Sequence, residues 1–278
     1  MVGMWFTEDQ TQHLLISVRI TDILHTEKTP YQQLVVVDTV EFGKMLVLDG
    51  AIQCTEKDEF FYHEMIAHVP MHVHLNPKRV CVIGGGDGGT VREVVKHPLV
   101  TEVKHVEIDG AVIEAAKKYF PTLSSGLADP RVEIVIADGI EYIKNAEAGS
   151  FNVIIIDSTD PVGPAVGLFS AEFYGYCHRA LTDDGVICAQ TESPLFEKDL
   201  LIKCWNNMKV HFSNVGVALG FAPSYPGGLW TYTVGSKQLP VQKNREVQIE
   251  GRYFKNSIME AAFDTPQFLQ EVLASGQK

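Results

Sequence analysis

The stretch Val80-Cys81-Val82-Ile83-Gly84-Gly85-Gly86-Asp87-Gly88-Gly89 decides the fold. Its first four residues form an apolar, mostly β-branched run, which is typical of a strand buried on both faces. Gly84, Gly86 and Gly89 then match the spacing G-x-G-x-x-G, which predicts a turn into a helix where the backbone closely approaches a ligand. Asp87 lies inside this turn, where a pyrophosphate would require positive potential instead. The turn therefore favours a ligand with a positive, unphosphorylated end over a dinucleotide.

The same alternation of apolar strand and helix continues downstream. Further strands are predicted at 103–108, 132–136, 153–156 and 186–190, followed by a pair of strands near 215–221 and 229–235. Helices are predicted at 91–96, 112–120, 140–145, 170–181 and 198–211. This alternation predicts an α/β fold in which a doubly wound parallel sheet is covered by helices on both faces.

Before this region the chain has a different pattern. Short β-branched and apolar runs, separated by turn signals such as Asp49-Gly50, predict a small antiparallel β-domain over residues 1–55. The remainder, 56–278, is then the larger catalytic domain. Thr55-Glu56-Lys57-Asp58 fits a capping box, so a helix should begin there and end or kink at Pro70.

Charge and composition narrow the classes of partner. The 278 residues carry a formal net charge of −12, which disfavours nucleic acid and anionic membranes and favours cationic partners. The N-terminus has no basic region followed by an apolar stretch, and no uncharged run is long enough to span a bilayer. The 5 cysteines include no C-x-x-C pair, which suits a reducing compartment. We therefore expect a cytoplasmic protein.

Acidic side chains gather at the ends of the predicted strands. They are Asp87, Glu107, Asp138, Asp157 and Asp160. The carboxyl ends of parallel strands meet at one edge of a sheet, where ligands bind. No strand-end loop in this stretch offers Lys or Arg to neutralise these acids. Such a cleft would repel an anionic substrate and attract a polycation.

Some of these acids also have structural interpretations. Glu107 suits the two hydroxyls of a ribose, whereas Asp109 is better explained as a helix N-cap. Asp138-Gly139 fits either a contact to adenine or an N-cap, and this choice stays open. Asp157 and Asp160 lie three residues apart in a proline-containing loop, which is either a substrate site or an ordinary polar turn.

The histidines and nucleophiles give weaker signals. His63 and His68 resemble a zinc-protease pair but are one residue too far apart, so they point to different faces of a helix. His68 and His72 lack a carboxylate that would complete a metal site. Tyr62 and His63 are better interpreted as a polar pair facing the cleft. No Cys or Ser has a recognisable base partner, so covalent catalysis is not expected.

Several motifs together closely resemble the spermidine synthase family. They are Tyr31-Gln32, Leu48-Asp49-Gly50, Glu56 to Phe60, Tyr62-His63-Glu64-Met65, Gly84 to Gly89, Asp138-Gly139, Asp157 to Pro164 and Tyr225-Pro226-Gly227-Gly228. The likeness runs from about Trp5 to Phe268. It implies a Rossmann-like, methyltransferase-type sheet behind an N-terminal β-domain, in a dimer or tetramer. Gly227 departs from the Ser typical of the family, so no hydroxyl acts at that position.

The resemblance also implies a reaction and residue roles. The aminopropyl group of decarboxylated S-adenosylmethionine would pass to putrescine, giving spermidine and methylthioadenosine, without a cofactor or metal. Asp157 would be the general base. The amine site would comprise Tyr62, His63, Asp87, Asp160 and Tyr225, with Trp5 nearby. The nucleoside site would comprise Gln32, Glu107, Asp138, Gly139 and Pro164.

Physical chemistry is consistent with that reaction and leaves alternatives open. A sulfonium already makes the transferred carbon electrophilic, so the protein must mainly orient a neutral amine and accept its proton. An S-adenosylmethionine methyltransferase shares the fold, an NAD-dependent oxidoreductase shares the glycine pattern, and a non-catalytic sensor shares the site. Asp87 and the pair Asp157 and Asp160 favour the aminopropyl reaction. The acceptor amine, the number of subunits and closure of the loop after Asp157 stay open.

Overall fold

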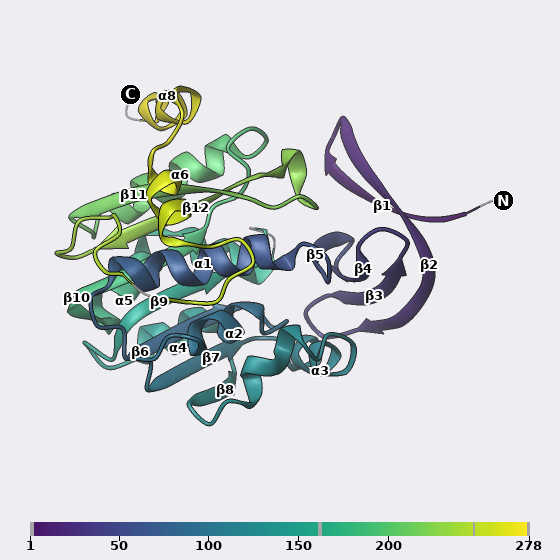
Figure 1. Cartoon of the computed structure of the whole chain (residues 1–278), viewed down its shortest axis with the longest axis horizontal. Coiled ribbons are helices and arrows are strands. Elements are labelled where there is room, and N and C mark those ends of the chain that lie inside the picture. The colour runs from purple at the N-terminus through teal and green to yellow at the C-terminus, as the bar shows by residue number, and fades with distance from the viewer. Residues whose placement is uncertain (1–2, 161–162, 247, 277–278) are drawn as a thin grey trace.

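The computed structural model describes residues 3–160, 163–246 and 248–276, and arranges them around two sheets (Figure 1). The strands are β1 (Met4–Thr11), β2 (Leu14–Lys28), β3 (Gln33–Thr39), β4 (Gly43–Leu48), β5 (Ala51–Thr55), β6 (Arg79–Gly84), β7 (Glu102–Glu107), β8 (Val132–Ile136), β9 (Phe151–Asp157), β10 (Leu181–Gln190), β11 (Asn214–Phe221) and β12 (Leu229–Ser236). The α-helices are α1 (Glu59–Val73), α2 (Gly89–Val95), α3 (Gly110–Tyr119), α4 (Gly139–Asn145), α5 (Ala171–Ala180), α6 (Lys198–Lys209), α7 (Asn256–Phe263) and α8 (Gln267–Ser275). Short 3-10 helices are η1 (Leu123–Ala128), η2 (Gly163–Phe169) and η3 (Pro226–Gly228).

The larger sheet has seven strands in the order β11-β12-β10-β9-β6-β7-β8. Strands β6 to β10 are parallel, whereas β12 pairs antiparallel with both β10 and β11. The chain runs outward from β6 through β7 to β8 and then returns to β9 on the other side of β6. This reversal is a topological switch point, and ligands of doubly wound sheets bind in the crevice that it opens. The predicted α/β fold is confirmed.

Side chains alternate between the two faces of this sheet and so build two cores. On β9, Val153 and Ile155 face one core, while Ile154 and Ile156 face the other. The first core is covered by α1, α2 and α7, and the second by α4, α5 and α6. A strand that is apolar at every position is therefore explained by burial on both sides.

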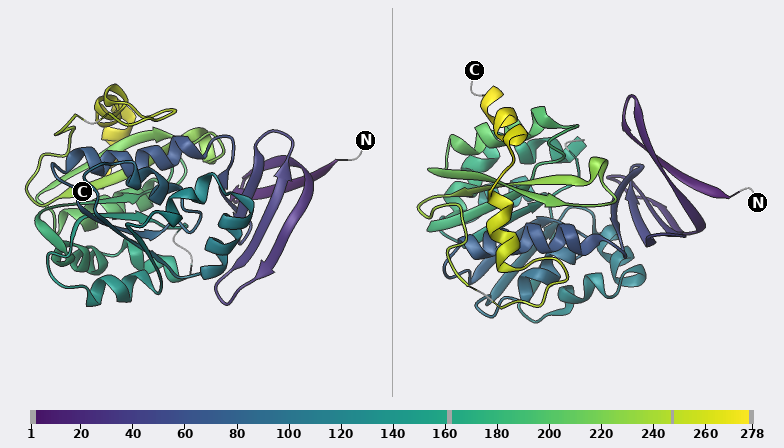
Figure 2. Two further views of the ribbon diagram at one scale, coloured as in Figure 1. Left: turned by 60° about the horizontal axis from the view of Figure 1, so that its bottom comes forward. Right: turned by 45° about the horizontal axis from the view of Figure 1, so that its top comes forward.

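The N-terminal sheet has five strands in the order β1-β2-β3-β4-β5 and lies at one end of the larger body (Figure 2). One face, including Leu34, Val36 and Leu46, packs on Val112 of α3 and on Phe120 just after it. The opposite face forms a second small core that includes Met45. Packing of the first face on α3 places β1 to β5 beside the switch point.

Helix α1 differs from the prediction at both ends. It begins at Glu59, because Thr55 and Asp58 instead bond to each other in the preceding turn, with Oγ1 to Oδ1 at 2.6 Å. Pro70 does not end the helix, which continues to Val73. All its residues except one are buried, and tertiary packing outweighs the loss of a single proline N–H.

Segments near the C-terminus complete the fold. The main-chain oxygens at the end of α1 accept hydrogen bonds from Asn244 and Arg245, and the carboxylate of Glu64 accepts three from the backbone of 252–254. Helices α7 and α8 were not predicted from the sequence pattern. Among the described residues, no helix combines the length and apolarity needed to cross a bilayer.

Candidate active site

The switch point brings the glycine turn and Asp157 together. Gly84 at the end of β6 is the register partner of Asp157 at the end of β9. Gly85 has φ +64° and lies so close to the Asp157 carboxylate that a Cβ atom there would overlap it. Gly85 is not one of the three glycines of the G-x-G-x-x-G match, and it is required by the protein's own carboxylate.

Asp157 is buried and held from two sides. The Tyr62 hydroxyl of α1 donates to Oδ1 at 2.7 Å, and the Thr90 hydroxyl of α2 donates to Oδ2 at 2.6 Å. Burial, followed by the nearby charge of Asp87, raises the pKa of Asp157 above its usual range. A carboxylate fixed in this way and with a raised pKa is suited to accept a proton.

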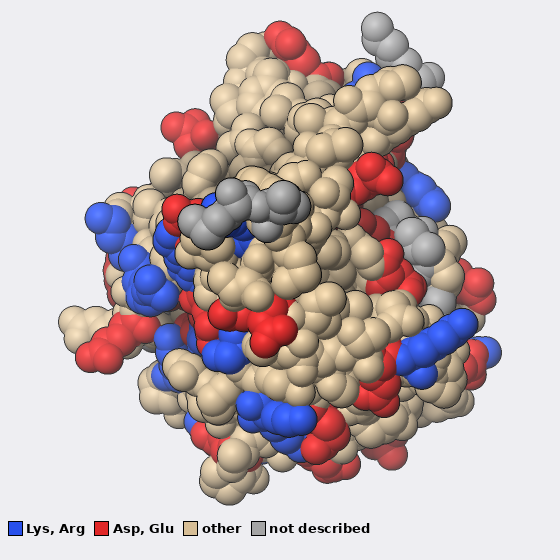
Figure 3. All heavy atoms as spheres, turned by 90° about the vertical axis from the view of Figure 1, so that its right-hand side faces the viewer, with Lys and Arg blue, Asp and Glu red and all other residues tan. Residues whose placement is uncertain are grey.

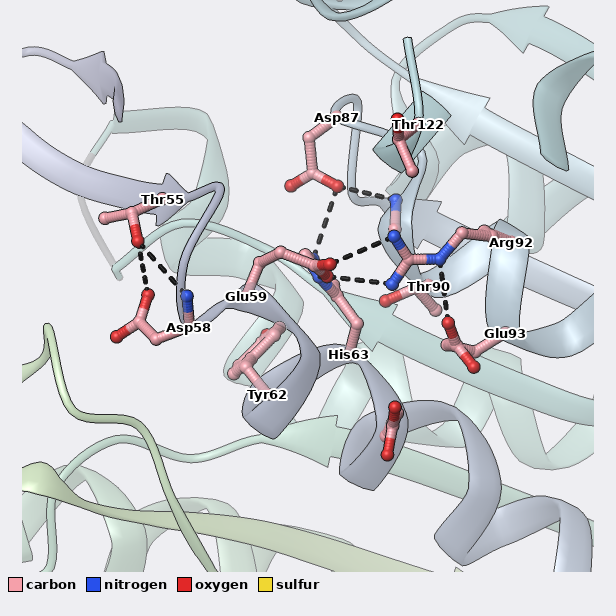
Figure 4. A network of polar contacts seen from close by, with 12 residues as sticks. Thr55, Asp58, Glu59, Tyr62, His63, Asp87, Thr90, Arg92, Glu93 and Thr122 are labelled. Carbon is pink, nitrogen blue, oxygen red and sulfur yellow. Dashed lines mark hydrogen bonds and ion pairs between the residues drawn. The ribbon is translucent and has the colours of Figure 1, made fainter. Parts of the chain in front are cut away.

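Asp87 lies beside a buried ion-pair network that the sequence analysis did not foresee (Figure 4). Its Oδ1 accepts from the Gly89 N–H at 2.7 Å and lies 3.3 Å from Nε2 of His63. Nδ1 of the same ring lies 2.6 Å from Glu59. Burial opposes a charged ring, but Asp87 and Glu59 outweigh it and raise the pKa of His63 well above its usual value. The two flanking carboxylates therefore favour the charged, imidazolium form of the ring.

Glu107 and Gln32 line the neighbouring end of the crevice. The Asp109 N–H donates to Oε1 of Glu107 at 2.8 Å, and burial raises the pKa of Glu107 to about 7. Asp109 itself is the N-cap of α3 and also accepts from Gln32 and Thr29, at 2.9 and 2.8 Å. The structural interpretation of Asp109 is confirmed, and the residue additionally ties the N-terminal sheet to the crevice.

Asp138 serves as the N-cap of α4 and also lines the crevice. Its Oδ1 accepts from the Ile140 N–H at 2.7 Å. A Cβ at Gly139 would overlap Ile83, so the strand end and the helix start approach more closely than another residue would allow. Capping and ligand contact are therefore compatible at Asp138.

Two adjoining cavities occupy the crevice and share part of their walls. The first, of about 320 Å³, is lined by residues including Gln32, Asp87, Glu107, Asp138 and Asp157. The second, of about 490 Å³, lies toward β1 and the end of β10. Tyr62, Asp160 and Tyr225 line both. The Tyr225 hydroxyl donates to the Gln53 main-chain oxygen, which fixes this wall to the N-terminal sheet.

The second cavity contains acids that the sequence analysis missed. Burial raises the pKa of Glu8 on β1 to about 7. Burial, followed by the charge of Asp160, raises the pKa of Glu192 well above its usual value. Glu192 follows β10, so the rule applied to the other strand ends would have found it. No comparable signal existed for Glu8, whose position depends on the docking of the N-terminal sheet.

The charge of the two cavities is one-sided. The acids that line one or both are Glu8, Asp9, Asp49, Asp87, Glu107, Asp138, Asp157, Asp160, Glu192 and Glu197. Among the described residues, those that line the cavities include no Lys, Arg or His. The outer face that carries the N-terminal sheet instead has both signs of charge interspersed (Figure 3). The acidity of the cavities is therefore local, and it favours a cationic ligand.

Not every expected residue lines a cavity. The ring of His63 lies behind Asp87, with its side chain 2% exposed, so the expectation that it faces the cleft is wrong. Trp5 is 59% exposed on β1 and lines neither cavity. Residues 161–162, in the loop after Asp157, and the side chain of Pro164 lie outside the described residues.

His68 and His72, the other histidines considered for a metal site, are engaged elsewhere. The two ring nitrogens of His68 contact His97 at 3.0 Å and Glu93 at 3.1 Å. Nδ1 of His72 contacts the His68 main-chain oxygen at 2.7 Å. Within the described residues, no three side chains of His, Cys, Asp or Glu form a group that could hold a metal ion.

Comparisons with known proteins agree with this geometry. Residues 59–245 match the model of a spermine/spermidine synthase domain, and residues 4–56 match that of a spermidine synthase tetramerisation domain. The polyamine aminopropyltransferase of Moorella thermoacetica is 52% identical over 100% of this chain and 99% of its own length. The enzyme of the same name from Thermoanaerobacter pseudethanolicus is 48% identical over 97% of this chain and 98% of its own.

Solved structures give the same result. A spermidine synthase in complex with the transition-state analogue AdoDATO has a TM-score of 0.93 at 39% identity, covering 98% of this chain and 95% of that one. The spermidine synthase of Thermotoga maritima has a TM-score of 0.89 at 38% identity, covering 98% of this chain and 94% of that one.

Proposed function

The chain belongs to the spermine/spermidine synthase family of polyamine aminopropyltransferases, and from this premise we propose that it transfers the aminopropyl group of decarboxylated S-adenosylmethionine to putrescine. The amine nitrogen attacks the methylene carbon next to the sulfonium. The carbon–sulfur bond breaks, and its electron pair stays on sulfur. The products are spermidine, methylthioadenosine and one proton.

The observation that carries this proposal is the one-sided charge of the two adjoining cavities. Among the described residues, ten acids line them. Asp49, Asp87, Glu107, Asp138, Asp157 and Asp160 line the first cavity, and the second adds Glu8, Asp9, Glu192 and Glu197. A sulfonium carrying an ammonium group, and a diamine, are cations of the kind that such a surface attracts. Both reactants thus fit the same electrostatic environment.

The first cavity suits the donor. Glu107 would accept the two ribose hydroxyls, and Asp138 with Gly139 would contact the adenine, with Gln32 and Pro164 alongside. The amine end of the donor would then lie at Asp87. Ordinary S-adenosylmethionine carries a carboxylate at that end, which Asp87 would repel, because the described residues that line the cavity include no Lys, Arg or His to bind that carboxylate. This repulsion explains a preference for the decarboxylated donor.

The second cavity suits the acceptor, and Asp157 lines the first cavity next to Tyr62 and Ser158, which line both. Putrescine would enter past Tyr225 and Tyr62, with its distal ammonium held by Asp160. Its reacting nitrogen must lose a proton before it attacks, and the nearby sulfonium lowers the pKa of that nitrogen. Asp157, already oriented by Tyr62 and Thr90, would accept the proton. The sulfonium activates the carbon by itself, so this chemistry requires no cofactor or metal.

We also propose that the chain assembles into a homo-oligomer through the N-terminal sheet. The matching model for residues 4–56 is described as a tetramerisation domain. Met4, Trp5, Leu15 and Ile23 on β1 and β2 leave large apolar side chains exposed, with Trp5 at 59%. Light scattering on the purified protein should give a mass of two or four chains; a monomer would contradict the assembly.

A direct test of the reaction is to incubate the protein with decarboxylated S-adenosylmethionine and a panel of diamines and polyamines. Mass spectrometry should detect methylthioadenosine and spermidine in equal amounts with putrescine. Product from a different amine alone would replace putrescine as the acceptor. A methylated product together with S-adenosylhomocysteine from ordinary S-adenosylmethionine would instead identify a methyltransferase.

A further inference from the structure

We propose that Glu59 and Arg92 are positioning residues that hold the His63 ring against Asp87 and thereby set the binding site for the ammonium end of the donor. Neither residue lines a cavity. They therefore act through His63 rather than on a substrate. This inference rests on the proposed function, because it assigns the donor's ammonium to Asp87.

Arg92 clamps Glu59 with both ends of its guanidinium. Nη1 donates to Oε1 of Glu59 at 3.0 Å, and Nη2 donates to Oε2 at 2.9 Å (Figure 4). The third nitrogen, Nε, donates to Glu93 at 2.7 Å. A planar guanidinium with all three nitrogens engaged has little freedom to turn. Glu59 is thus fixed in orientation as well as in charge.

Glu59 in turn fixes the protonation and direction of the His63 ring. Its Oε2 lies 2.6 Å from Nδ1, while Nε2 faces Asp87 at 3.3 Å. A carboxylate beside each ring nitrogen favours a proton on both. Asp87, Glu59 and Arg92 are the charged groups around the ring, and Asp157 is the next carboxylate beyond Asp87.

The ring has little room to move in the other direction. Gly89 is the first residue of α2, and a Cβ atom there would overlap the His63 ring. The same Gly89 donates its N–H to Oδ1 of Asp87. Asp87 therefore has one oxygen occupied by Gly89 and His63, which leaves Oδ2 free to meet a ligand.

Arg92 is itself anchored from behind. Glu93 is fully buried and is contacted by His68 at 3.1 Å and by Lys96 at 2.6 Å, in addition to Arg92. Positive groups outweigh the effect of burial and lower the pKa of Glu93 to about 2. Charges thus alternate in sign from Asp87 through His63, Glu59 and Arg92 to Glu93. A row of alternating charges like this one can hold the Asp87 carboxylate in one orientation at the cavity wall.

The test compares the binding of two ligands, of which only one carries the aminopropyl amine. Methylthioadenosine lacks the aminopropyl amine, whereas decarboxylated S-adenosylmethionine carries it. Isothermal titration calorimetry on the full chain should show that Glu59→Gln and Arg92→Met each weaken binding of the donor relative to methylthioadenosine by about tenfold. Arg92→Lys keeps the charge but loses the fork, so it should restore the ratio only in part.

Arg131→Met is the matched control. Arg131 also clamps a carboxylate with two nitrogens, at Asp129, and it contacts the other end of α2 through the Val95 main-chain oxygen. Its loss should leave the ratio of the two dissociation constants unchanged, even if stability falls. A purely structural role for Glu59 and Arg92 would weaken both ligands alike and would overturn the inference.

A measurement on the unaltered protein needs no substitution at Glu59 or Arg92. Spectra of ¹⁵N-labelled histidine, with His63 assigned by the loss of its signals in His63→Gln, should show both ring nitrogens protonated at neutral pH. A neutral His63 would overturn the inference. If the wild-type protein fails to bind the decarboxylated donor more tightly than methylthioadenosine, the proposed function fails instead, so the two failures are distinguishable.

Discussion

Glu59 and Glu192 are both buried carboxylates close to the same pair of cavities, but their surroundings are opposite. Around Glu59, the positive side chains of His63 and Arg92 outweigh burial and lower the pKa. Around Glu192, burial and the negative charge of Asp160 act together and raise it. The first carboxylate has cationic partners within the protein, whereas the second, among the described residues, accepts from the neutral amide of Gln190 at 3.0 Å and has another acid, Asp160, beside it.

This difference separates two uses of acidic residues in one molecule. A buried carboxylate with matched cations keeps its charge compensated, and removing either partner destabilises the fold because the remaining charge stays buried and unpaired. A buried carboxylate without one destabilises the fold until a cationic ligand arrives. The side near Glu59 is thus a scaffold, and the side near Glu192 is a binding surface. Asp157 lies where the two meet.

The largest effect is expected at that meeting point. Asp157→Asn keeps the acceptor for Tyr62 but removes the group that takes up the proton, so single-turnover rates should fall by about 10²- to 10⁴-fold. The dissociation constant for methylthioadenosine, measured in parallel, should change little. A variant that turns over at the wild-type rate would remove Asp157 as the base.

The scaffold side is expected to tolerate even one methyl group poorly. Gly89→Ala places a Cβ into the His63 ring, and the resulting shift should cost about 1–3 kcal/mol in the free energy of unfolding. Gly110→Ala is the control, because a Cβ at the start of α3 meets only Ile136, at 3.5 Å. Chemical denaturation should separate the two variants, and equal stabilities would contradict the tight packing at His63.

Removing an acid on the binding side should change stability in the opposite direction from removing one on the scaffold side. Glu192→Gln removes an unpaired buried acid, so the melting temperature should rise by about 2–4 °C, while the KM for putrescine should rise by about tenfold. On the scaffold side, Glu59→Gln should lower the melting temperature. If both substitutions shift it in the same direction, the distinction between the two sides is wrong.

The smallest expected effect is on the pH dependence of stability, to which Glu8 and Glu93 contribute with opposite signs. Burial raises the pKa of Glu8 from 4.5 to about 7, so the folded protein binds more protons than the unfolded chain between those values. The contribution of Glu8 to stability therefore declines as pH rises through that window. Glu93, with its pKa lowered to about 2, contributes stability that is present above pH 4.5 and is lost as pH falls toward 2.

Denaturation curves across this range test the two signs. Glu8→Gln should flatten the decline between pH 4.5 and 7, and Glu93→Gln should flatten the loss at lower pH. Identical slopes for Glu8→Gln and the wild-type protein would show that Glu8 titrates as an ordinary exposed acid.

The binding side was largely predictable from the sequence, and the scaffold side was not. The carboxyl end of a buried parallel strand can be recognised in the sequence by an abrupt change from apolar to polar residues, as at Ile156-Asp157 and Val106-Glu107. The topology then brings these ends together. Asp87, Asp138 and Asp160 were predicted from their positions after strands. The same reasoning would also have identified Glu192, which follows β10.

Arg92, in contrast, has no local signal. In the sequence it is one charged residue on a short predicted helix, and its partner Glu59 lies 33 positions earlier in the chain. Only the packing of α1 on α2 brings them together. The orientation of His63 was missed for the same reason, since the direction of its ring depends on Gly89. Likewise, Pro70 lies inside α1, and the carbonyls that follow it bond to Asn244 and Arg245, which no local rule anticipates.

The most direct measurement is the ratio of the dissociation constants for decarboxylated and ordinary S-adenosylmethionine, in the wild-type protein and in Asp87→Asn. If Asp87 selects a cationic donor end by repelling a carboxylate, the wild-type protein should strongly favour the decarboxylated form. Asp87→Asn should then narrow the ratio by about tenfold, which corresponds to about 1.4 kcal/mol. An unchanged ratio would show that the charge of Asp87 does not determine the preference for the decarboxylated donor.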